Sequence, residues 1–367
     1  MSRPPIPEDR HLGYDDFWAF LYRTTPRPLS FRATNREEWL AWRSALRTKV
    51  QELLGPPRAA VPLRAEILES IDCGSYVRQR VVYDTEPHVS VAAYLLLPKN
   101  TTRRKAGLLC LHGHAAAGKD IMAGVSGWNL RQRRAIARFN KDIGAQFAAR
   151  GYVCLCPDAR GWGERADGYF RRSALDSSHP FEGRRDPCNV HFLKAQLFGL
   201  NLQWLNTWDD LRGLDYLAAH PHVDPTKLGA VGFSYGGTRA MFAAALDERI
   251  TAVDISSYLS SFFEYGIRRN ETCGAQLVPG ILNWCELADI AALIAPRPLL
   301  CESGEWDEGF PVGEARRAFD LVRSCYEVAG APERCEHEVF RGGHMFAAGR
   351  AFSFMSHWLR DLPRPAS

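Results

Sequence analysis

A serine in a short glycine-rich segment is the residue whose surroundings point most clearly to chemistry. Residues 232–237 are Gly-Phe-Ser-Tyr-Gly-Gly and match the pattern G-x-S-x-G, in which the serine stands on a sharp turn from a strand to a helix. An apolar run at 228–233 precedes Ser234, and a helical pattern at 238–246 follows it. The flanking glycines let the strand and the helix pass closely, and the helix N-terminus favours developing negative charge. The segment therefore predicts that Ser234 is a nucleophile.

A serine hydroxyl reacts poorly unless a base takes its proton, and the sequence offers a candidate base late in the chain. His344 follows the last apolar strand and comes directly after two glycines, in a loop. We expect this loop to bring the imidazole close to Ser234. His337 falls inside the preceding strand and His357 inside the last helix, so both are predicted to be structural.

The base needs a carboxylate to orient it, and residues 302–311 contain four. Asp307 is favoured because it lies beyond the glycine that ends a strand and before the proline at position 311. Glu305 is the next choice, and Asp254, near the end of the strand after the nucleophile, is the third. With Asp307 the order along the chain is Ser, Asp, His, which is the order found in α/β-hydrolases.

Two backbone N–H groups are expected to stabilise the oxyanion of a tetrahedral intermediate. One belongs to Tyr235, the residue after the nucleophile, and the other to His114, in the loop after the apolar strand that ends at Leu111. The side chains of His112 and His114 also invite a metal interpretation, but a His-Gly turn beside such a strand is more often structural. The sequence therefore predicts neither a metal ion nor a cofactor here.

Alternating strands and helices are expected to position these residues. The run Gly-Leu-Leu-Cys-Leu at 107–111 is continuously apolar, as is typical of a strand buried on both faces of a parallel sheet. Further strands are predicted at 152–156, 228–233, 250–255, 298–302 and 336–340, and helices at 135–150, 202–219, 238–246, 287–294, 314–329 and 347–359. This alternation predicts an α/β fold with a mostly parallel sheet and helices on both faces.

Two regions are predicted ahead of the parallel strands. Helical spacing of aromatic and aliphatic residues at 14–54, ended by Gly-Pro-Pro, indicates an N-terminal helical extension over residues 1–64 that packs on the main body. Residues rich in β-branched and aromatic side chains at 77–83 and 89–97 predict an antiparallel meander at the start of a catalytic domain, residues 65–367. Insertions are expected at 161–199 and 256–284, and the second is expected to cover the site.

Several segments together resemble a known group, the α/β-hydrolases near acetyl xylan esterases, cephalosporin C deacetylases and dienelactone hydrolases. The resemblance covers roughly residues 65–359. It rests on Leu-His-Gly-His at 111–114, Asp-Ala-Arg-Gly-Trp-Gly at 158–163, the serine motif, Ala-Pro-Arg-Pro-Leu at 295–299, Asp307 and Gly-His at 343–344. It implies the α/β-hydrolase fold and a Ser234–His344–Asp307 triad.

The chain departs from the sugar deacetylases of this group at three positions. Those enzymes carry an Arg-Gly-Gln motif, a glutamine after the serine and a glutamate after the histidine, where this sequence has Trp162, Tyr235 and Met345. The closer resemblance is to bacterial acetyl xylan esterase-like hydrolases with an N-terminal helical extension. Arg160 is interpreted as a buried cation that ties loops together near the site.

Composition and charge limit the classes of partner that we expect the protein to bind. A formal charge of +4, from 46 Lys+Arg against 42 Asp+Glu, argues against a nucleic acid or an anionic membrane as partner. No apolar run of about 18 residues and no signal-peptide pattern at the N-terminus are seen. The ten cysteines indicate buried, reduced thiols and a cytoplasmic protein. Cys154 and Cys156 lack the second pair that a zinc site would need.

The favoured hypothesis is a hydrolase of small-acyl carboxylic esters, with acetyl as one candidate acyl group. The alternatives are a serine peptidase, because residues 232–237 also resemble the nucleophile motif of prolyl oligopeptidases, and a non-catalytic binding protein on the same fold. Trp162, Trp306 and Tyr258 are the first candidates to line a substrate pocket, with Trp128, Phe262 and Phe263 as further ones. The partner is expected to be a small ester, and the exposed extension could mediate homo-oligomer formation.

Overall fold

The computed structural model describes residues 10, 12–99, 103–115, 117–127, 130–167 and 186–361. One pocket candidate, Trp128, and the middle of the first predicted insertion, residues 168–185, lie outside the described residues. Within these ranges no helix is both long enough and apolar enough to span a bilayer.

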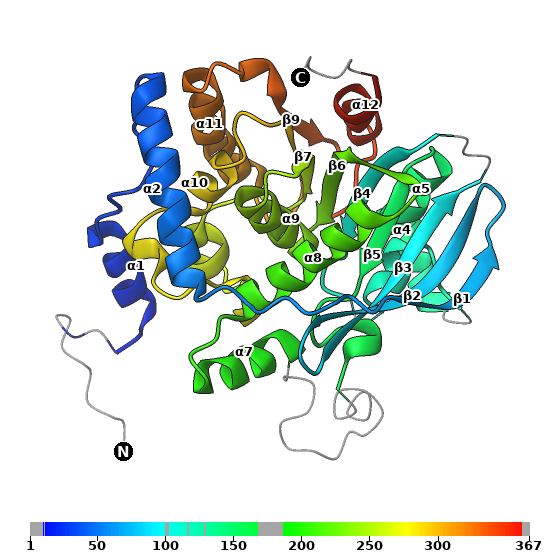
Figure 1. The fold of residues 1–367 in the computed structure, drawn as a ribbon. Coiled ribbons are helices and arrows are strands. Elements are labelled where there is room, and N and C mark those ends of the chain that lie inside the picture. Colours follow the sequence, from blue (N-terminus) through cyan, green and yellow to red (C-terminus); the bar gives the residue numbers. More distant parts are fainter. Residues whose placement is uncertain are drawn as a thin grey trace, which may run out of the picture.

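Within the described residues nine strands form one mixed sheet in the order β1-β2-β3-β5-β4-β6-β7-β8-β9 (Figure 1). The first three strands are antiparallel and lie at one end of the sheet. They are β1 (Glu66–Asp72), β2 (Tyr76–Glu86) and β3 (Val89–Pro98). Strand β3 also pairs antiparallel with β5, and every later pairing is parallel. The predicted parallel sheet with an N-terminal antiparallel meander is confirmed.

The parallel strands are mostly buried on both faces, as their apolar sequences predict; the exception is the edge strand at residues 335–340, which is half-buried. They are β4 (Lys105–Leu111), β5 (Val153–Pro157), β6 (Val223–Phe233), β7 (Ile250–Ser256), β8 (Leu299–Gly304) and β9 (Cys335–Phe340). In β4 the side chains of Leu109 and Leu111 belong to one hydrophobic core, and those of Leu108 and Cys110 belong to the other. The sheet therefore separates two cores.

Helices cover each face of the sheet. The larger core is closed by α8 (Leu202–Ala219), α9 (Tyr235–Leu246), α10 (Leu287–Ala292) and α11 (Val312–Val328). The smaller core lies under α3 (Lys119–Met122), α5 (Ile143–Ala149) and α12 (Ala351–Ser356). Two more helices, α4 (Leu130–Phe139) and α7 (Pro187–Leu197), precede α5 and α8 respectively.

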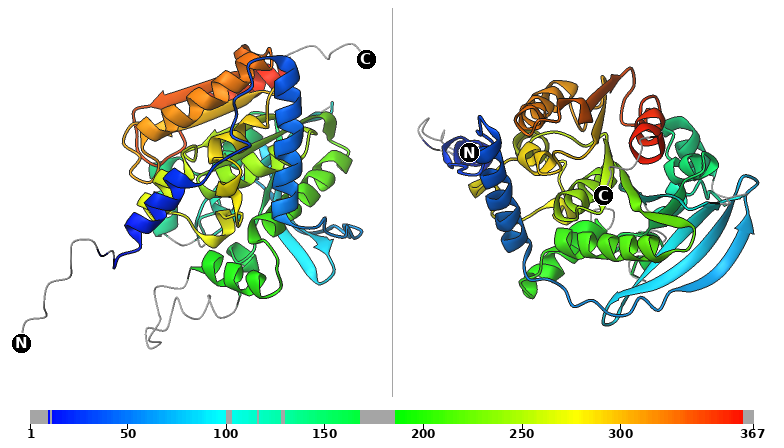
Figure 2. Two further views of the ribbon diagram at one scale, coloured as in Figure 1. Left: turned by 90° about the vertical axis from the view of Figure 1, so that its left-hand side faces the viewer. Right: turned by 45° about the horizontal axis from the view of Figure 1, so that its top comes forward.

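The N-terminal extension contains two helices, α1 (Asp15–Thr24) and α2 (Arg36–Leu54), which lie beside the helical layer of the larger core (Figure 2). Prolines at 26 and 28 fall between them; a proline disfavours helical geometry in the residue before it, so the segment 14–54 is not one continuous helical region. Buried side chains of α2, including Trp42 and Leu46, belong to the larger core. The Arg43 and Arg47 guanidinium groups each lie 3.0 Å from the Glu248 carboxylate.

Other predicted boundaries shift by a few residues. The helix expected at 135–150 is interrupted between α4 and α5, where Asn140 has a φ of 54°. The helix expected at 347–359 starts only at Ala351 and ends in a π-helical turn, His357–Asp361. The segment 256–284 contains only short turns: a π turn (Phe262–Arg268) and two 3-10 turns (Gly274–Gln276 and Ile281–Asn283).

Replacing Leu46 with alanine tests whether the extension is part of the hydrophobic core. Leu46 is fully buried against that core, so Leu46→Ala is expected to lower the free energy of unfolding by about 2–5 kcal/mol. Urea denaturation measures this change. Leu40 on the same helix is 51% exposed, and Leu40→Ala is expected to change the free energy by at most about 0.5 kcal/mol. Equal effects of the two substitutions would mean that α2 does not share the core.

Candidate active site

Ser234 lies on the tight turn between β6 and α9, in a backbone conformation that L-residues rarely adopt. Its φ is 55° and its ψ is −122°, a strained geometry that persists only where the surroundings enforce it. A Cβ on Gly232 would overlap the carbonyl oxygen of Gly236, and a Cβ on Gly236 would overlap that of Leu111. Glycine at both positions therefore lets β6, α9 and β4 meet closely enough to hold the serine at the end of the sheet.

His344 lies next to this serine, although the two are 110 residues apart in the chain. Its Nε2 atom is 2.9 Å from the Ser234 Oγ atom. The loop that carries His344 is held by two hydrogen bonds: the Trp306 N–H donates to the Gly342 carbonyl at 2.9 Å, and the Ser257 hydroxyl donates to the Met345 carbonyl at 3.1 Å. The structure thus brings the predicted base and the predicted nucleophile into hydrogen-bond contact.

Asp307 completes a hydrogen-bonded row of three side chains. Its Oδ2 atom lies 2.8 Å from the His344 Nδ1 atom. Its Oδ1 atom accepts from the backbone N–H groups of Gly309 at 3.0 Å and Phe310 at 3.1 Å. Because those two donors hold the carboxylate, its second oxygen faces the imidazole. In this arrangement the Nδ1–H of His344 donates to Asp307 and leaves Nε2 free to accept the serine proton.

The other two candidate acids lie elsewhere. Glu305 is exposed, and Asp254 is fully buried within β7. Burial raises the pKa of Asp254 well above its usual range. Neither oxygen of its carboxyl group has a hydrogen-bond partner among the described residues, so this group does not orient His344. Among the four carboxylates of residues 302–311, Asp307 is the one that the structure shows hydrogen-bonded to His344.

The two other histidines near the C-terminus, His337 and His357, make contacts with residues other than Ser234 and Asp307. His337 is half-buried in β9 with its Nε2 atom 3.0 Å from the Ser303 hydroxyl, and burial lowers its pKa to about 4. His357 is exposed at the C-terminal turn and contacts Trp358.

The loop after β4 passes directly beside Ser234. A Cβ on Gly113 would lie 3.2 Å from the Ser234 Cβ and 3.0 Å from the Phe233 carbonyl oxygen. Tyr235, the other predicted oxyanion residue, is the first residue of α9, and N–H groups in the first turn of a helix have no partner within that helix. The backbones that would supply both predicted oxyanion donors therefore flank Ser234.

His112 has a purely internal role. It is buried, its Nε2 atom accepts from the Ala159 N–H at 3.0 Å, and its Nδ1 atom lies 2.8 Å from the Gly113 carbonyl. Burial lowers its pKa well below the usual range. The neutral ring therefore fastens the loop after β4 to the end of β5.

A cavity of about 700 Å³ opens over Ser234 and His344. The predicted pocket residue Trp306 lines it and is 64% exposed. Tyr258 is fully buried and packs against Tyr265 and Phe310, two residues that do line the cavity. Tyr258 thus supports the cavity wall from behind, because it has no surface to offer a ligand.

The remaining aromatic candidates lie beside the cavity or away from it. Trp162 packs edge-on against the His114 ring, with the centroids 5.5 Å apart. Phe262 is buried, and Phe263 stacks on Tyr22 of α1 at 4.6 Å. The side chains of Trp162, Phe262 and Phe263 therefore pack against other side chains and do not line the cavity.

Several cavity residues carry no local sequence signal. Phe310 stacks on the His344 ring with centroids 5.6 Å apart, and the Phe233 ring lies tilted against the same imidazole with centroids 4.9 Å apart. Arg138 and Lys141 bring positive charge to the cavity wall, and burial lowers the pKa of Lys141. Glu271 and Gln276, from the predicted covering segment 256–284, add polar groups. Only the folded chain brings these residues together.

Arg160 lies at the centre of a buried ion-pair network. Its guanidinium group pairs bidentately with Asp209, at 2.8 and 2.9 Å, and also pairs with Glu86. Arg165 pairs with the same aspartate at 2.8 Å. These contacts join the loop after β5 to α8 and to the end of β2, which agrees with the structural interpretation of Arg160.

Comparison with known proteins places the chain in a family. The sequence model of the Abhydrolase family matches residues 17–350. The protein named "Putative hydrolase YtaP" of Bacillus subtilis is 24% identical over 326 residues, which are 86% of this chain and 100% of that protein.

Solved structures support the same fold. A structure titled as a "putative acetyl xylan esterase" from Bacteroides fragilis superimposes with a TM-score of 0.74 and 20% identity, covering 92% of this chain and 84% of the other. A glucuronoyl esterase from Solibacter usitatus superimposes with a TM-score of 0.62 and 16% identity, covering 91% of this chain and 96% of the other. Together with the sheet order, these similarities establish an α/β-hydrolase fold.

The buried carboxyl groups of Asp254 and Glu302 predict an unusual pH dependence of stability. Burial raises the pKa of both groups, and the neighbouring Asp254 raises that of Glu302 further. The folded state therefore holds protons that the unfolded chain releases above about pH 4.5. Stability due to this pair is present at low pH and declines as the pH rises towards the folded-state pKa values. Glu302→Gln is expected to make the free energy of unfolding fall less between about pH 5 and pH 8.

Urea titrations between about pH 5 and pH 8 measure how steeply the free energy of unfolding changes with pH. Glu327 on α11 is exposed, and Glu327→Gln serves as the matched control whose slope stays that of the unmodified protein. A Glu302→Gln slope identical to that of this control would contradict the raised pKa values of these buried carboxyl groups.

Proposed function

The chain belongs to the Abhydrolase family, and from that premise we propose that it is a serine hydrolase that cleaves carboxylic esters through an acyl-enzyme on Ser234. The observation that carries this proposal is the hydrogen-bonded row Ser234–His344–Asp307, with separations of 2.9 and 2.8 Å. Three side chains from three different loops meet with the distances that nucleophilic catalysis requires.

In the first half-reaction the Ser234 Oγ atom attacks the ester carbonyl carbon while its proton moves to the His344 Nε2 atom. The carbonyl oxygen becomes an oxyanion, which the N–H groups of Tyr235 and His114 are proposed to bind. Asp307 stabilises the imidazolium ion. When the carbon–oxygen bond to the alcohol breaks, the alcohol oxygen takes the proton from Nε2, and the acyl group stays on Ser234.

In the second half-reaction water replaces the alcohol. His344 accepts a proton from the water as its oxygen attacks the acyl carbon, and a second oxyanion forms in the same place. When the bond to the Ser234 Oγ atom breaks, that oxygen recovers the proton from His344. The products are a carboxylic acid and the original enzyme.

The substrate class that we propose is a small-acyl ester of a polar alcohol such as a carbohydrate. The cavity offers one exposed aromatic face, Trp306, on which a sugar ring could stack, and charged groups at Arg138, Lys141 and Glu271 that could bind hydroxyl groups. The titles of the structural neighbours name esterases that act on acetyl xylan and on glucuronoyl esters.

Ser234→Ala is expected to lower kcat by at least about a thousandfold, because the nucleophile of a triad is removed. Hydrolysis of p-nitrophenyl acetate measures kcat. Ser260 is also buried, and its hydroxyl has no hydrogen-bond partner among the described residues; Ser260→Ala is expected to keep kcat within a few-fold of normal. Near-normal turnover by Ser234→Ala would refute the proposal.

A substrate panel separates ester hydrolysis from peptidase activity. Acetylated sugars, glucuronate esters and lactones are compared with aminoacyl p-nitroanilides under the same conditions. The proposal expects at least one ester class to have the highest kcat/KM and the anilides to be inert. Faster cleavage of an aminoacyl anilide would favour the peptidase alternative, and no turnover of any substrate would favour a non-catalytic protein.

A further inference from the structure

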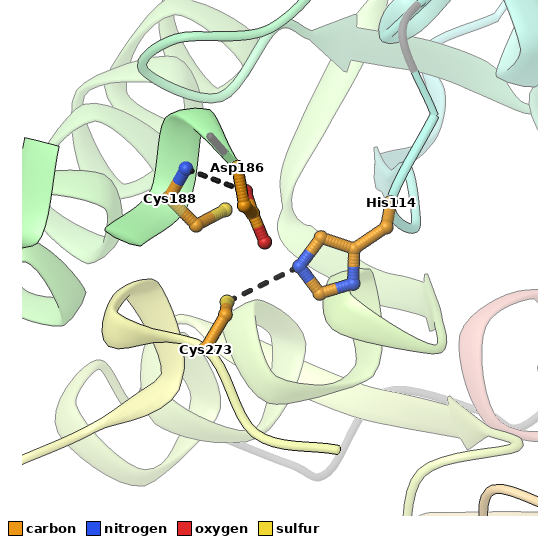
Figure 3. Close-up of side chains that lie close together, drawn as sticks. All are labelled: His114, Asp186, Cys188 and Cys273. Atoms are coloured by element: carbon orange, nitrogen blue, oxygen red, sulfur yellow. Dashed lines mark hydrogen bonds between the residues drawn. The ribbon is translucent and has the colours of Figure 1, made fainter. Parts of the chain in front are cut away.

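Four side chains with metal-binding atoms lie close together, and one of them, His114, lines the cavity. They are His114, Asp186, Cys188 and Cys273, and one ligand atom from each lies within 4.8 Å of all the others (Figure 3). His114 comes from the loop after β4, Asp186 and Cys188 from the start of α7, and Cys273 from the residue before the 3-10 turn Gly274–Gln276. The chain folds three separate segments to bring them together.

The set of atoms matches the preferences of one kind of ion. An imidazole nitrogen, two thiol sulfurs and a carboxylate oxygen are the ligands that Zn²⁺ takes in tetrahedral sites, whereas Ca²⁺ and Mg²⁺ require oxygen ligands. Ligand atoms around a tetrahedral zinc ion are about 3.3–3.8 Å apart. The His114 Nε2 and Cys273 Sγ atoms are 3.2 Å apart, so small side-chain adjustments would seat the ion.

Neighbouring groups hold the four side chains in place. The Asp186 Oδ1 atom caps α7 by accepting from the Cys188 N–H at 2.8 Å, and the other carboxylate oxygen points towards His114 and Cys273 (Figure 3). The Trp162 indole N–H donates to the Cys188 Sγ atom at 3.2 Å. The His114 ring stacks on Tyr235, with centroids 4.7 Å apart and planes 18° apart. Such outer contacts orient the ligands of metal sites.

The surrounding side chains pack tightly and hold the segment around Cys273 against α7. A Cβ on Gly274 would overlap the Phe192 side chain of α7, and the Gly274 N–H donates to the Asn189 side chain at 2.8 Å. Cys188 and Cys273 are buried in a small apolar cluster of their own, separate from the two main cores. An ion would therefore bind between segments that the fold already holds close together.

We propose that His114, Asp186, Cys188 and Cys273 bind a structural zinc ion. All four protein ligands are present, so the ion has no open coordination position for substrate, as in structural rather than catalytic zinc sites. Its place is at the loop after β4, whose backbone passes beside Ser234. The ion would thus tie that loop to α7 and to the covering segment 256–284. Zinc binding at these residues does not depend on the proposed esterase activity.

Metal analysis of the full-length enzyme tests the proposal. The protein is purified without a metal-affinity tag, reduced, incubated with Zn²⁺ and desalted, and its zinc content is measured by mass spectrometry. About one zinc per chain is expected. Cys188→Ser and Cys273→Ser are each expected to weaken zinc binding at least about tenfold. Cys285 is equally buried and lies outside the cluster, so Cys285→Ser should keep the full zinc content.

A second measurement needs no variant and remains decisive if a substitution prevents folding. Co²⁺ added to the metal-free enzyme is expected to produce the intense visible bands of a tetrahedral ion together with thiolate-to-cobalt charge-transfer absorption. Stoichiometric Zn²⁺ should abolish these bands. Thermal unfolding of the zinc-loaded protein should occur at a higher Tm than that of the metal-free protein.

Four results would overturn the proposal. The first is a reduced wild-type protein that retains no zinc after desalting. The second is cobalt binding without thiolate charge transfer. The third is unchanged zinc content in both Cys188→Ser and Cys273→Ser. Peptide mapping that finds a Cys188–Cys273 disulfide in zinc-incubated, reduced protein would also overturn it, because a disulfide consumes both thiolates.

Discussion

The backbone of Ser234 is the constraint on which the rest of the site depends. A non-glycine residue with a φ of 55° and a ψ of −122° is unfavourable in isolation, so packing must hold it. Helix α9 supplies this packing, because every one of its residues from Tyr235 to Leu246 is buried. The Arg239–Asp210 ion pair, also fully buried, joins α9 to α8 with a bond of 2.9 Å from the arginine Nε atom. The packing of α9 on all sides therefore holds Ser234 in its unfavourable backbone conformation.

The loops that carry His344 and Asp307 are packed equally closely. A Cβ on Gly304, at the end of β8, would overlap the Gly343 carbonyl oxygen, so the strand that leads to Asp307 touches the loop that carries His344. The Phe310 ring covers the imidazole, and the backbone of Phe310 donates to Asp307. One short segment thus orients both residues. Positions at the carboxyl ends of parallel strands are where α/β sheets bind their ligands, and the cavity lies there.

Much of this arrangement could be predicted from the sequence, because its strongest signals are local. The continuous apolar run of β4 indicated a strand buried on both faces, and the glycine-rich turn marked the end of β6. The position of His344 after the last predicted strand made it the candidate base, and the position of Asp307 between Gly304 and Pro311 favoured it among neighbouring carboxylates. Helix boundaries were less predictable where one residue decides them: Asn140, with a φ of 54°, separates α4 from α5, and asparagine alone does not signal such a break.

Contacts between distant segments were outside what the sequence could indicate. His112 and His114 are two residues apart, yet one fastens the loop after β4 internally while the other meets Cys273, 159 residues away. Tyr258 and Trp306 looked equivalent as pocket candidates, but one is fully buried and the other 64% exposed. Nothing in the composition or spacing of these residues distinguishes them; the paths of the intervening loops do.

The most direct test of the central claim is to ask whether the constrained hydroxyl of Ser234 is the reactive atom. The folded enzyme is treated with a fluorophosphonate, and intact-mass and peptide mass spectrometry locate the adduct. We expect one adduct per chain on the peptide that contains Ser234, and none after the protein is unfolded in urea before treatment. An adduct on another residue, or no adduct on the folded enzyme, would contradict the account.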